Sequence, residues 1–251
     1  MEFIKSKENK LYKTIKKLKT RKYREKEKLF IAEGQKFLDF KETPWAMLLK
    51  EGDNRYIEKA EGFTCPKYIL SEALFNELSS QENSQGILLI YSMCESSIET
   101  IGHNIVVLDR IQDPGNLGTI IRVADAAGYR DIILLKGSVD VYNEKTVRSS
   151  MGSLFNMNFI YMEEEEVIKF IDQENYKSTV TALREDAIPY TDIIPGSKNA
   201  IIFGNEGQGV SERIIESSHS KVIIPIYGLA ESLNVAVAAG IVLYKFRELL
   251  I

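Results

Sequence analysis

"NIVVLDRIQDPGNLGTIIRVADAAG", residues 104–128, sets the pattern for the second half of the chain. Its apolar run Ile105–Leu108 is typical of a strand buried in a parallel sheet. Pro114 and Gly115 predict a turn, and Asn116 stands where a helix N-cap belongs. The helix expected next has one apolar face, made by Leu117, Ile120, Ile121, Ala124 and Ala127. The stretch therefore predicts a buried strand, a turn and a helix that packs on the sheet.

The same alternation continues to the end of the chain. Further strands are predicted at 131–137, 156–162, 176–183, 199–204 and 221–226. Helices are predicted between and after them, at 143–150, 163–174, 211–218 and 233–250. Strands that alternate with helices predict an open parallel α/β sheet, and such sheets bind ligands at the carboxyl ends of their strands.

The first half of the chain alternates in the same way over shorter elements. Strands are predicted at 29–34, 46–50, 66–70 and 86–92, with helices at 35–40, 55–62 and 72–80 between them. This pattern favours a small α/β sandwich. The polar segment 93–104 reads as the connection. We expect a first domain at 1–95, a linker at 96–104 and a second domain at 105–251.

Charge is distributed unevenly along the chain. Residues 1–36 hold 13 Lys/Arg and 5 Asp/Glu, a net charge of +8, although the whole chain carries −4. Residues 9–28 are expected to form one basic helix that docks through Leu11, Ile15 and Leu18. A basic segment of this kind favours contact with a nucleic acid. A helix that simply exposes its polar side to water is the alternative.

Composition restricts the class of protein further. Cys65 and Cys94 are too few for a disulfide framework, and with only two histidines a His/Cys metal site is not expected. Val235–Tyr244, the longest strongly apolar run, is too short to cross a bilayer. The charged first 30 residues argue against a signal peptide. We expect a reduced cytoplasmic protein with no membrane segment and no metal.

Three loops at predicted strand ends carry the candidate chemistry: "DPGNLGTIIR" at 113–122, "FGNEGQGVS" at 203–211 and "IPIYGLAESLNVAVA" at 224–238. The glycine spacing of the second loop differs from the dinucleotide fingerprint, and no phosphate-loop lysine is present. Taken singly, the polar residues of each loop are explained by turns and helix caps.

Taken together and in this order, the loops resemble the three motifs of the SpoU (TrmH-type) RNA 2′-O-ribose methyltransferases of the SPOUT superfamily. Asn116, Gly118 and Arg122 match motif one, and the other two loops match motifs two and three. The resemblance covers residues 105–251. Upstream, "FIAEG" followed by "GILLI" is similar to an L30e-like substrate-binding domain. The basic opening is similar to the ribosomal-RNA branch that includes the thiostrepton-resistance enzymes, and "RSSMGSLFNMNF" at 148–159 also fits the family.

The resemblance implies a fold, a cofactor and an assembly. The fold is a parallel-sheet domain with a deep trefoil knot, preceded by a small α/β domain, and the active site forms between the two protomers of a homodimer. The cofactor is S-adenosylmethionine, bound by a set of loop residues: Leu183, Gly204, Asn205, Gly209, Ile224, Ile226 and Leu233. Independently of the resemblance, glycines let a backbone approach a ligand closely, because no Cβ stands in the way.

The resemblance also implies a catalytic set: Asn116, Arg122, Glu206, Ser232 and Asn234. Methyl transfer to a ribose hydroxyl needs in-line approach and removal of the hydroxyl proton. Arg122 is expected to help with that proton together with an RNA phosphate, or to clamp the phosphate. Glu206 orients Arg122 or the substrate, and Ser232 bonds to the ribose or to Arg122. Asn116 fixes its turn, and Asn234 caps the last helix.

The sequence therefore predicts an S-adenosylmethionine-dependent RNA 2′-O-ribose methyltransferase acting on 23S-type ribosomal RNA. A transfer RNA substrate is one alternative. A non-catalytic RNA-binding assembly factor that retains the knot is another, although all five catalytic-motif residues are kept. A plain nucleotide-binding domain is the third, and the absence of both phosphate-loop and dinucleotide motifs counts against it.

Overall fold

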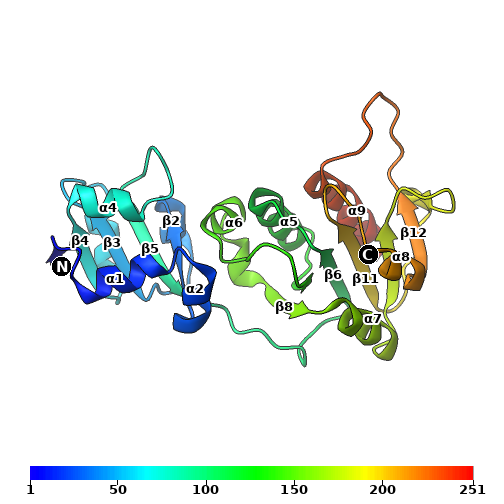
Figure 1. The fold of residues 1–251 in the computed structure, drawn as a ribbon, viewed down its shortest axis with the longest axis horizontal. Coiled ribbons are helices and arrows are strands. Elements are labelled where there is room, and N and C mark those ends of the chain that lie inside the picture. The colour runs from blue at the N-terminus through cyan, green and yellow to red at the C-terminus, as the bar shows by residue number, and fades with distance from the viewer. Residues whose placement is uncertain (251) are drawn as a thin grey trace. The chain divides into compact units, whose positions relative to one another are not determined.

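The protein, described by a computed structural model over residues 1–250, divides into two compact units. The N-terminal unit comprises Met1–Met93 and Asp140–Phe155. The C-terminal unit comprises the rest of the chain, Cys94–Val139 and the residues from Asn156 onward. Residues 140–155 fall inside the predicted 105–251 domain, yet they pack with the N-terminal unit. Each unit has its own sheet (Figure 1).

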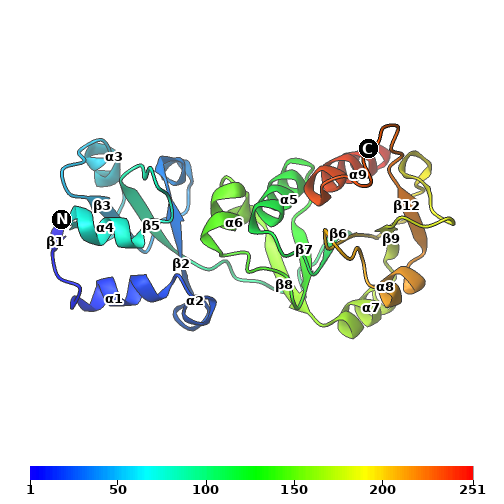
Figure 2. The same ribbon diagram turned by 45° about the horizontal axis from the view of Figure 1, so that its top comes forward.

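The N-terminal unit is built on a mixed five-stranded sheet in the order β1-β4-β3-β5-β2. Its strands are β1 (Glu2–Ile4), β2 (Leu29–Glu33), β3 (Ala46–Lys50), β4 (Lys67–Leu70) and β5 (Ile87–Ser92). Its helices are α1 (Lys10–Lys17), α2 (Arg21–Glu27), η1 (Gln35–Asp39), α3 (Ile57–Glu61), α4 (Glu72–Leu78) and α6 (Glu144–Ser149). Helices α1 and α4 lie on one face of the sheet (Figure 2) and share one core with it. Every predicted element of 29–92 is present, with η1 as a 3₁₀ helix, and β1 was not predicted.

The basic N-terminal segment forms two helices, so the prediction of one continuous helix is wrong. The α1 helix ends at Leu18, and Thr20 is extended before α2 starts. The Nη1 of Arg24 donates to the carbonyl of Leu18 at 2.7 Å, a contact that the break in the helix makes possible. The predicted docking is confirmed for Ile15 and Leu18, which are fully buried.

The segment between Asp140 and Phe155 is anchored in the N-terminal unit by both of its ends. Arg24 of α2 forms an ion pair with Asp140, and the ring centroids of Phe155 and Tyr91 lie 4.8 Å apart. Gly152 has φ +91°, and a Cβ there would meet the ring of Phe40 at 1.8 Å. The glycine is therefore required by backbone conformation and by this close approach together.

The C-terminal unit is a seven-stranded sheet in the order β10-β12-β9-β11-β6-β7-β8, and all of its named strand pairs are parallel. Its strands are β6 (Asn104–Asp109), β7 (Asp131–Leu135), β8 (Asn158–Met162), β9 (Lys177–Thr181), β10 (Ile188–Pro189), β11 (Asn199–Gly204) and β12 (Ser220–Ile223). Its helices are α5 (Pro114–Ala126), α7 (Glu164–Gln173), α8 (Glu212–Ser217) and α9 (Val235–Leu249), with the 3₁₀ turn η3 (Tyr190–Asp192). A further 3₁₀ turn, η2 (Ser153–Asn156), spans the boundary of the two units. The predicted open parallel α/β sheet is confirmed.

Helices cover both faces of this sheet, α5 and α9 on one and α7 and α8 on the other (Figure 2). The apolar face predicted for α5 is confirmed, since all five of its residues are buried. The start of α5 differs from the prediction. Asp113 is the N-cap and accepts from the backbone N–H of Asn116, so Pro114 and Gly115 begin the helix and Asn116 lies in its first turn. Proline suits this position because its missing N–H would have had no partner there.

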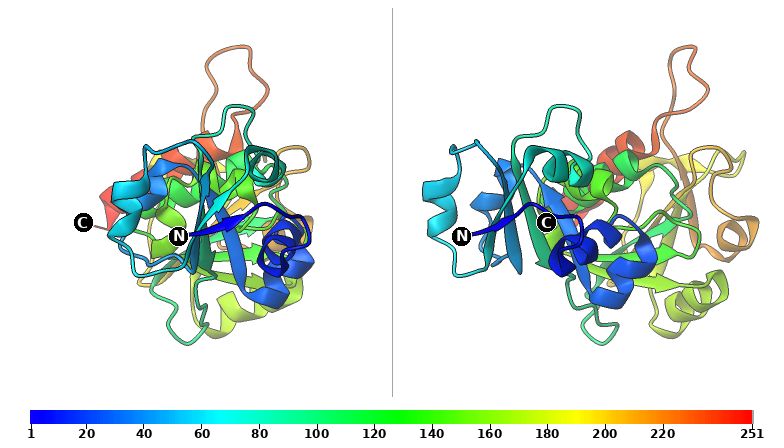
Figure 3. Two further views of the ribbon diagram at one scale, coloured as in Figure 1. Left: turned by 90° about the vertical axis from the view of Figure 1, so that its left-hand side faces the viewer. Right: turned by 60° about the vertical axis from the view of Figure 1, so that its left-hand side comes forward.

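Between β12 and α9 the chain leaves the body of the C-terminal unit as a long loop, residues 224–234 (Figures 1 and 3). Tyr227 and Leu229 on this loop are almost completely exposed. Among residues 1–250, no helix has the length and apolar character needed to span a bilayer.

Candidate cofactor and substrate site

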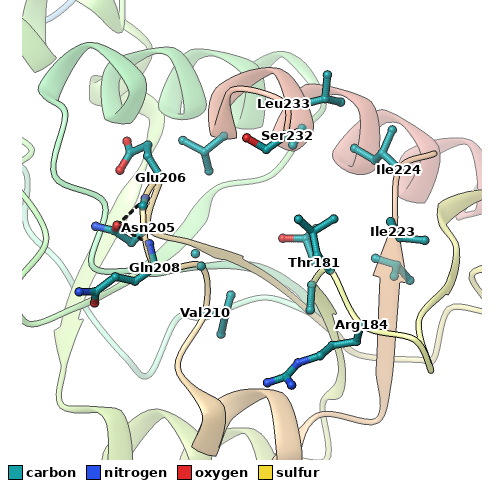
Figure 4. Close-up of a pocket in the computed structure, with 18 of the residues that line it drawn as sticks. Thr181, Arg184, Asn205, Glu206, Gln208, Val210, Ile223, Ile224, Ser232 and Leu233 are labelled. Carbon is teal, nitrogen blue, oxygen red and sulfur yellow. Dashed lines mark hydrogen bonds between the residues drawn. The ribbon is translucent and has the colours of Figure 1, made fainter. Parts of the chain in front are cut away.

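A cavity of about 730 Å³ opens at the carboxyl ends of three neighbouring strands of the C-terminal unit (Figure 4). Thr181 ends β9, Gly204 ends β11 and Ile223 ends β12, and all three line the cavity. The place is the one where parallel α/β sheets bind ligands. The volume lies within the range of about 300–1,000 Å³ common to small-molecule sites.

The cavity gathers residues that lie far apart in the sequence. All seven predicted cofactor-binding residues line it: Leu183, Gly204, Asn205, Gly209, Ile224, Ile226 and Leu233. Three predicted catalytic residues, Glu206, Ser232 and Asn234, line it as well. Sequence reasoning missed other lining residues, among them Thr181, Arg184, Gln208, Val210, Glu212, Ile223 and Glu231. The rule that ligands bind at strand ends could have found Thr181 and Ile223, whereas Arg184 and Glu212 carry no local signal.

The glycine-rich loop after β11 closes on itself. Asn205 and Gly209 exchange two backbone hydrogen bonds, of 3.1 and 2.9 Å, and the Asn205 side chain accepts from the N–H groups of Gly207 and Gln208. A Cβ on Gly204 would lie 2.2 Å from the carbonyl carbon of Gly209. The absence of a side chain at Gly204 therefore makes room for the loop's own backbone. This differs from the sequence-based expectation that it makes room for a ligand. Gly209 adopts φ +70° with open space around it.

A buried carboxylate supports this loop from β6. Asp109 is fully buried and accepts three hydrogen bonds: from Arg110 Nε at 2.6 Å, from Arg110 Nη2 at 3.0 Å and from the Ser211 N–H at 2.7 Å. Arg110 has the left-handed φ of +56°, and its carbonyl accepts from Asn205 Nδ2 at 2.9 Å. The hydrogen bonds to Asp109 raise the pKa of Arg110. Asp109 and Arg110 thus hold both ends of the loop, a role that no local sequence pattern indicates.

Three of the predicted catalytic residues form one hydrogen-bonded chain. Asn116 Nδ2 donates to Glu206 Oε1 at 2.8 Å, and Asn234 Nδ2 donates to Asn116 Oδ1 at 3.0 Å. The Asn234 side chain also accepts from the N–H groups of Ala236 and Val237, so its predicted cap on α9 is confirmed. One residue from each of the three sequence motifs is therefore present in the same cluster.

Arg122 stands apart from this cluster. Its side chain is exposed on α5, does not line the cavity, and makes no ion pair or hydrogen bond with residues 1–250. Ser232 lines the cavity from the long 224–234 loop. A single chain therefore presents the cavity and the Asn116–Glu206–Asn234 cluster without bringing Arg122 to either.

The cavity fits an organic cofactor. Its lining combines apolar side chains, backbone at strand ends and a few charged groups, as small-molecule and cofactor sites do. Within residues 1–250, no cluster of three or more His, Cys, Asp or Glu side chains is arranged to hold a metal ion.

Comparison with known proteins identifies the family. The model of the SpoU rRNA Methylase family matches residues 103–244, and that of the MRM3-like substrate binding domain matches residues 9–89. The chain thus has the two parts of an RNA-modifying enzyme. One is a parallel α/β unit with a cavity at its strand ends, and the other is a substrate-binding unit that precedes it in the sequence. The chain belongs to the SpoU rRNA methylase family.

Relatives match over the whole chain. The 23S rRNA (guanosine(2553)-2′-O)-methyltransferase RlmP of Bacillus subtilis is 37% identical over 251 residues, 98% of this chain and 100% of that protein. An rRNA methyltransferase from Sinorhizobium meliloti, solved with AdoMet bound, superposes with a TM-score of 0.85 at 29% identity, over 100% of this chain and 98% of that one. The AdoMet complex of AviRb from Streptomyces viridochromogenes gives a TM-score of 0.84 at 25% identity, covering 96% of this chain and 97% of that one.

The tRNA (guanosine(18)-2′-O)-methyltransferase of Thermus thermophilus is 30% identical over 145 residues, 57% of this chain and 73% of that protein. As a member of the family, the chain is an RNA methyltransferase, and S-adenosylmethionine, predicted from the three loop motifs, is confirmed as its cofactor.

Proposed function

We propose that this chain methylates the ribose 2′-oxygen of a nucleotide in 23S ribosomal RNA. The observation that supports it most is the match to RlmP along the whole chain, including the N-terminal unit. The tRNA enzyme of Thermus thermophilus matches only 57% of this chain. A match that includes the substrate-binding unit favours ribosomal RNA over transfer RNA. A non-catalytic role is disfavoured because the Asn116–Glu206–Asn234 cluster is intact.

The cavity would hold the cofactor through the seven residues predicted from the sequence. Backbone groups at Gly204, Ile224 and Leu233 would bond its polar edges, and Leu183 and Ile226 would cover its apolar surfaces; all five residues line the cavity. When bound, S-adenosylmethionine supplies an electrophilic methyl group on a sulfonium. We propose that the chain forms the deep trefoil knot of its family around this site.

Arg122 supports the proposal of a homodimer. The residue is exposed and outside the cavity of its own chain, so a second copy of the chain is the natural source of this side chain at each active site. There its guanidinium would bind an RNA phosphate with two parallel hydrogen bonds and place the ribose for in-line attack. It would also stabilise the 2′-oxygen as the hydroxyl proton passes to the bound RNA phosphate.

Glu206 is proposed to orient the incoming Arg122 or the ribose. Asn116 donates to one carboxylate oxygen of Glu206, which fixes the carboxylate and leaves its other oxygen for a guanidinium or a hydroxyl. Asn234 in turn holds Asn116, so the cofactor loop and the substrate-orienting carboxylate are linked. Ser232, which lines the cavity from the 224–234 loop, would bond the ribose or Arg122.

The N-terminal unit is proposed to bind the RNA. We propose that the chain works as an RNA-binding domain at 1–95, a linker at 96–104 and a methyltransferase domain at 105–251. We also propose that the protein acts in the cytoplasm. Not every cation of the basic segment is free to do so. Arg24 is buried, and Lys7 and Lys16 both pair with Glu77. Hydrogen bonds from Lys16, Lys7 and Tyr12 lower the pKa of Glu77 to about 2, so that it stays ionised and keeps both lysines engaged. The surface that faces RNA is therefore less basic than the count of +8 implies.

Mapping of ribose methylation tests the target. RNA from cells with and without the gene is to be compared at every nucleotide. The expected result is the loss of ribose methylation at one position of 23S ribosomal RNA when the gene is absent. Loss from a transfer RNA instead would support the alternative substrate, and unchanged methylation of both would contradict the proposed function.

A further inference from the structure

One charged pair of the cavity has no role in the function described so far. Arg184 follows β9, Glu212 begins α8, and Arg184 Nη2 forms an ion pair with the Glu212 carboxylate. Both residues line the cavity. The pair is partly open to solvent, with 41% of the Arg184 side chain and 59% of the Glu212 side chain exposed, so solutes can reach it.

Arg184 is the only cation among the residues that line the cavity. The other charged lining residues are the carboxylates Glu206, Glu212 and Glu231. Glu206 already accepts from Asn116, and Figure 4 shows it on the opposite side of the cavity from Arg184. Arg184 is therefore the one lining side chain with which the carboxylate of a bound ligand could form an ion pair.

The amino-acid end of S-adenosylmethionine has the matching chemistry. It carries a carboxylate and an ammonium on one carbon, and charges taken from water into a cavity require partners. A guanidinium binds a carboxylate with two parallel hydrogen bonds, and a carboxylate accepts from an ammonium. Arg184 and Glu212 lie next to each other with opposite charges, as the two ends of such a zwitterion require.

Resting on the proposed function, we propose that Arg184 and Glu212 form the subsite for the α-amino-acid end of the cofactor. Arg184 binds the carboxylate, and Glu212 binds the ammonium. Without the ligand, the Arg184 guanidinium pairs with the Glu212 carboxylate. When the ligand is bound, its carboxylate and ammonium join these two groups in a ring of four alternating charges. The nucleoside end then extends away from this pair, toward the rest of the cavity.

Calorimetry with three ligands tests the subsite: S-adenosylmethionine, S-adenosylhomocysteine and methylthioadenosine, which has the nucleoside and the thioether but no amino-acid end. For Arg184→Ala, the Kd of the first two is expected to rise by about tenfold or more, the order for a lost charge-assisted hydrogen bond. The Kd of methylthioadenosine is expected to change by less than about twofold. Glu212→Gln is expected to show the same selectivity.

Arg213→Ala is the matched control. Arg213 is the next residue on α8 and pairs with Glu164 and Glu165 outside the cavity, so its loss is expected to leave all three Kd values unchanged. Exposed ion pairs contribute little to stability, so the variants are expected to fold. Equal weakening of all three ligands, or no weakening, in Arg184→Ala overturns the subsite. Failure of the unmodified protein to bind S-adenosylmethionine would instead overturn the proposed function.

Discussion

Replacing Arg122 by alanine is expected to lower methyl transfer by about 10²-fold or more, the order for losing proton-transfer help or a positioned charge. The fold, the dimer and the affinity for S-adenosylmethionine are expected to stay nearly unchanged. Arg122 is exposed, outside the cavity, and away from the buried face of α5 that carries Leu117 and Ile121. Its truncation leaves no cavity, so stability should change by within about 0.5 kcal/mol. Single-turnover rates with saturating cofactor and RNA are the measurement.

Two companion samples separate the possible roles of Arg122. Arg122→Lys keeps the charge and loses the planar fork, so substantial recovery of the rate would favour electrostatic positioning. Mixed dimers of Arg122→Ala with Glu206→Gln should regain activity that neither parent has, because one of their two sites combines the intact residues of both chains. Near-normal turnover of Arg122→Ala would end the catalytic assignment, and mixed dimers no more active than their parents would contradict a shared site.

Replacing Arg24 by alanine is expected to destabilise the N-terminal unit by about 3–5 kcal/mol, the usual cost of leaving one partner of a buried ion pair alone. Arg24 is 4% exposed and Asp140 8%. Arg24 Nε and Nη2 lie 2.8 and 2.5 Å from Asp140 Oδ2. The pair joins the break between α1 and α2 to the Asp140–Phe155 segment. Its loss should therefore lower the denaturant midpoint of the transition that reports on this unit.

Arg21→Ala is the control for Arg24→Ala. Arg21 lies on the same helix, and its exposed pair with Glu25 should contribute less than about 1 kcal/mol. Arg24→Met combined with Asp140→Leu should recover most of the stability, because two apolar side chains of similar volume remove both buried charges. A midpoint for Arg24→Ala equal to that of Arg21→Ala would show that the buried pair does not hold the segment.

The sequence predicts the parallel sheet because most of its strands are apolar on both faces and long enough to give a continuous apolar run. The strands β1 and β10, of three and two residues, have no such pattern and were not predicted. The break at Leu18 was missed because the helical spacing of apolar residues ends there, while the charged sequence continues without a proline or glycine. The sequence predicts the N-cap of α5 at Asn116 because a proline in the first turn of a helix has the same sequence signal as a proline in a turn.

The site was predictable where motif order could be recognised. Motif order predicts Asn116, Glu206 and Asn234 as one site, although the hydrogen bonds that join them span 90 and 118 positions, which no periodicity encodes. The roles of Asp109, Arg184 and Glu212 depend on contacts that only the folded chain creates, and ordinary charged residues at strand and helix ends give no local sign of them. The packing of Asp140–Phe155 with the N-terminal unit is long-range in the same way.

The most direct test of the central claim is the chemical form of the product. Purified protein is to be incubated with unmodified 23S ribosomal RNA and S-adenosylmethionine labelled in its methyl group, and the RNA then hydrolysed in alkali. A 2′-O-methyl group removes the hydroxyl that alkali uses to cleave the chain, so the account predicts that the label is recovered in an alkali-resistant dinucleotide. Label recovered in single nucleotides methylated on the base, or no transfer to RNA by protein that binds the cofactor, would contradict it.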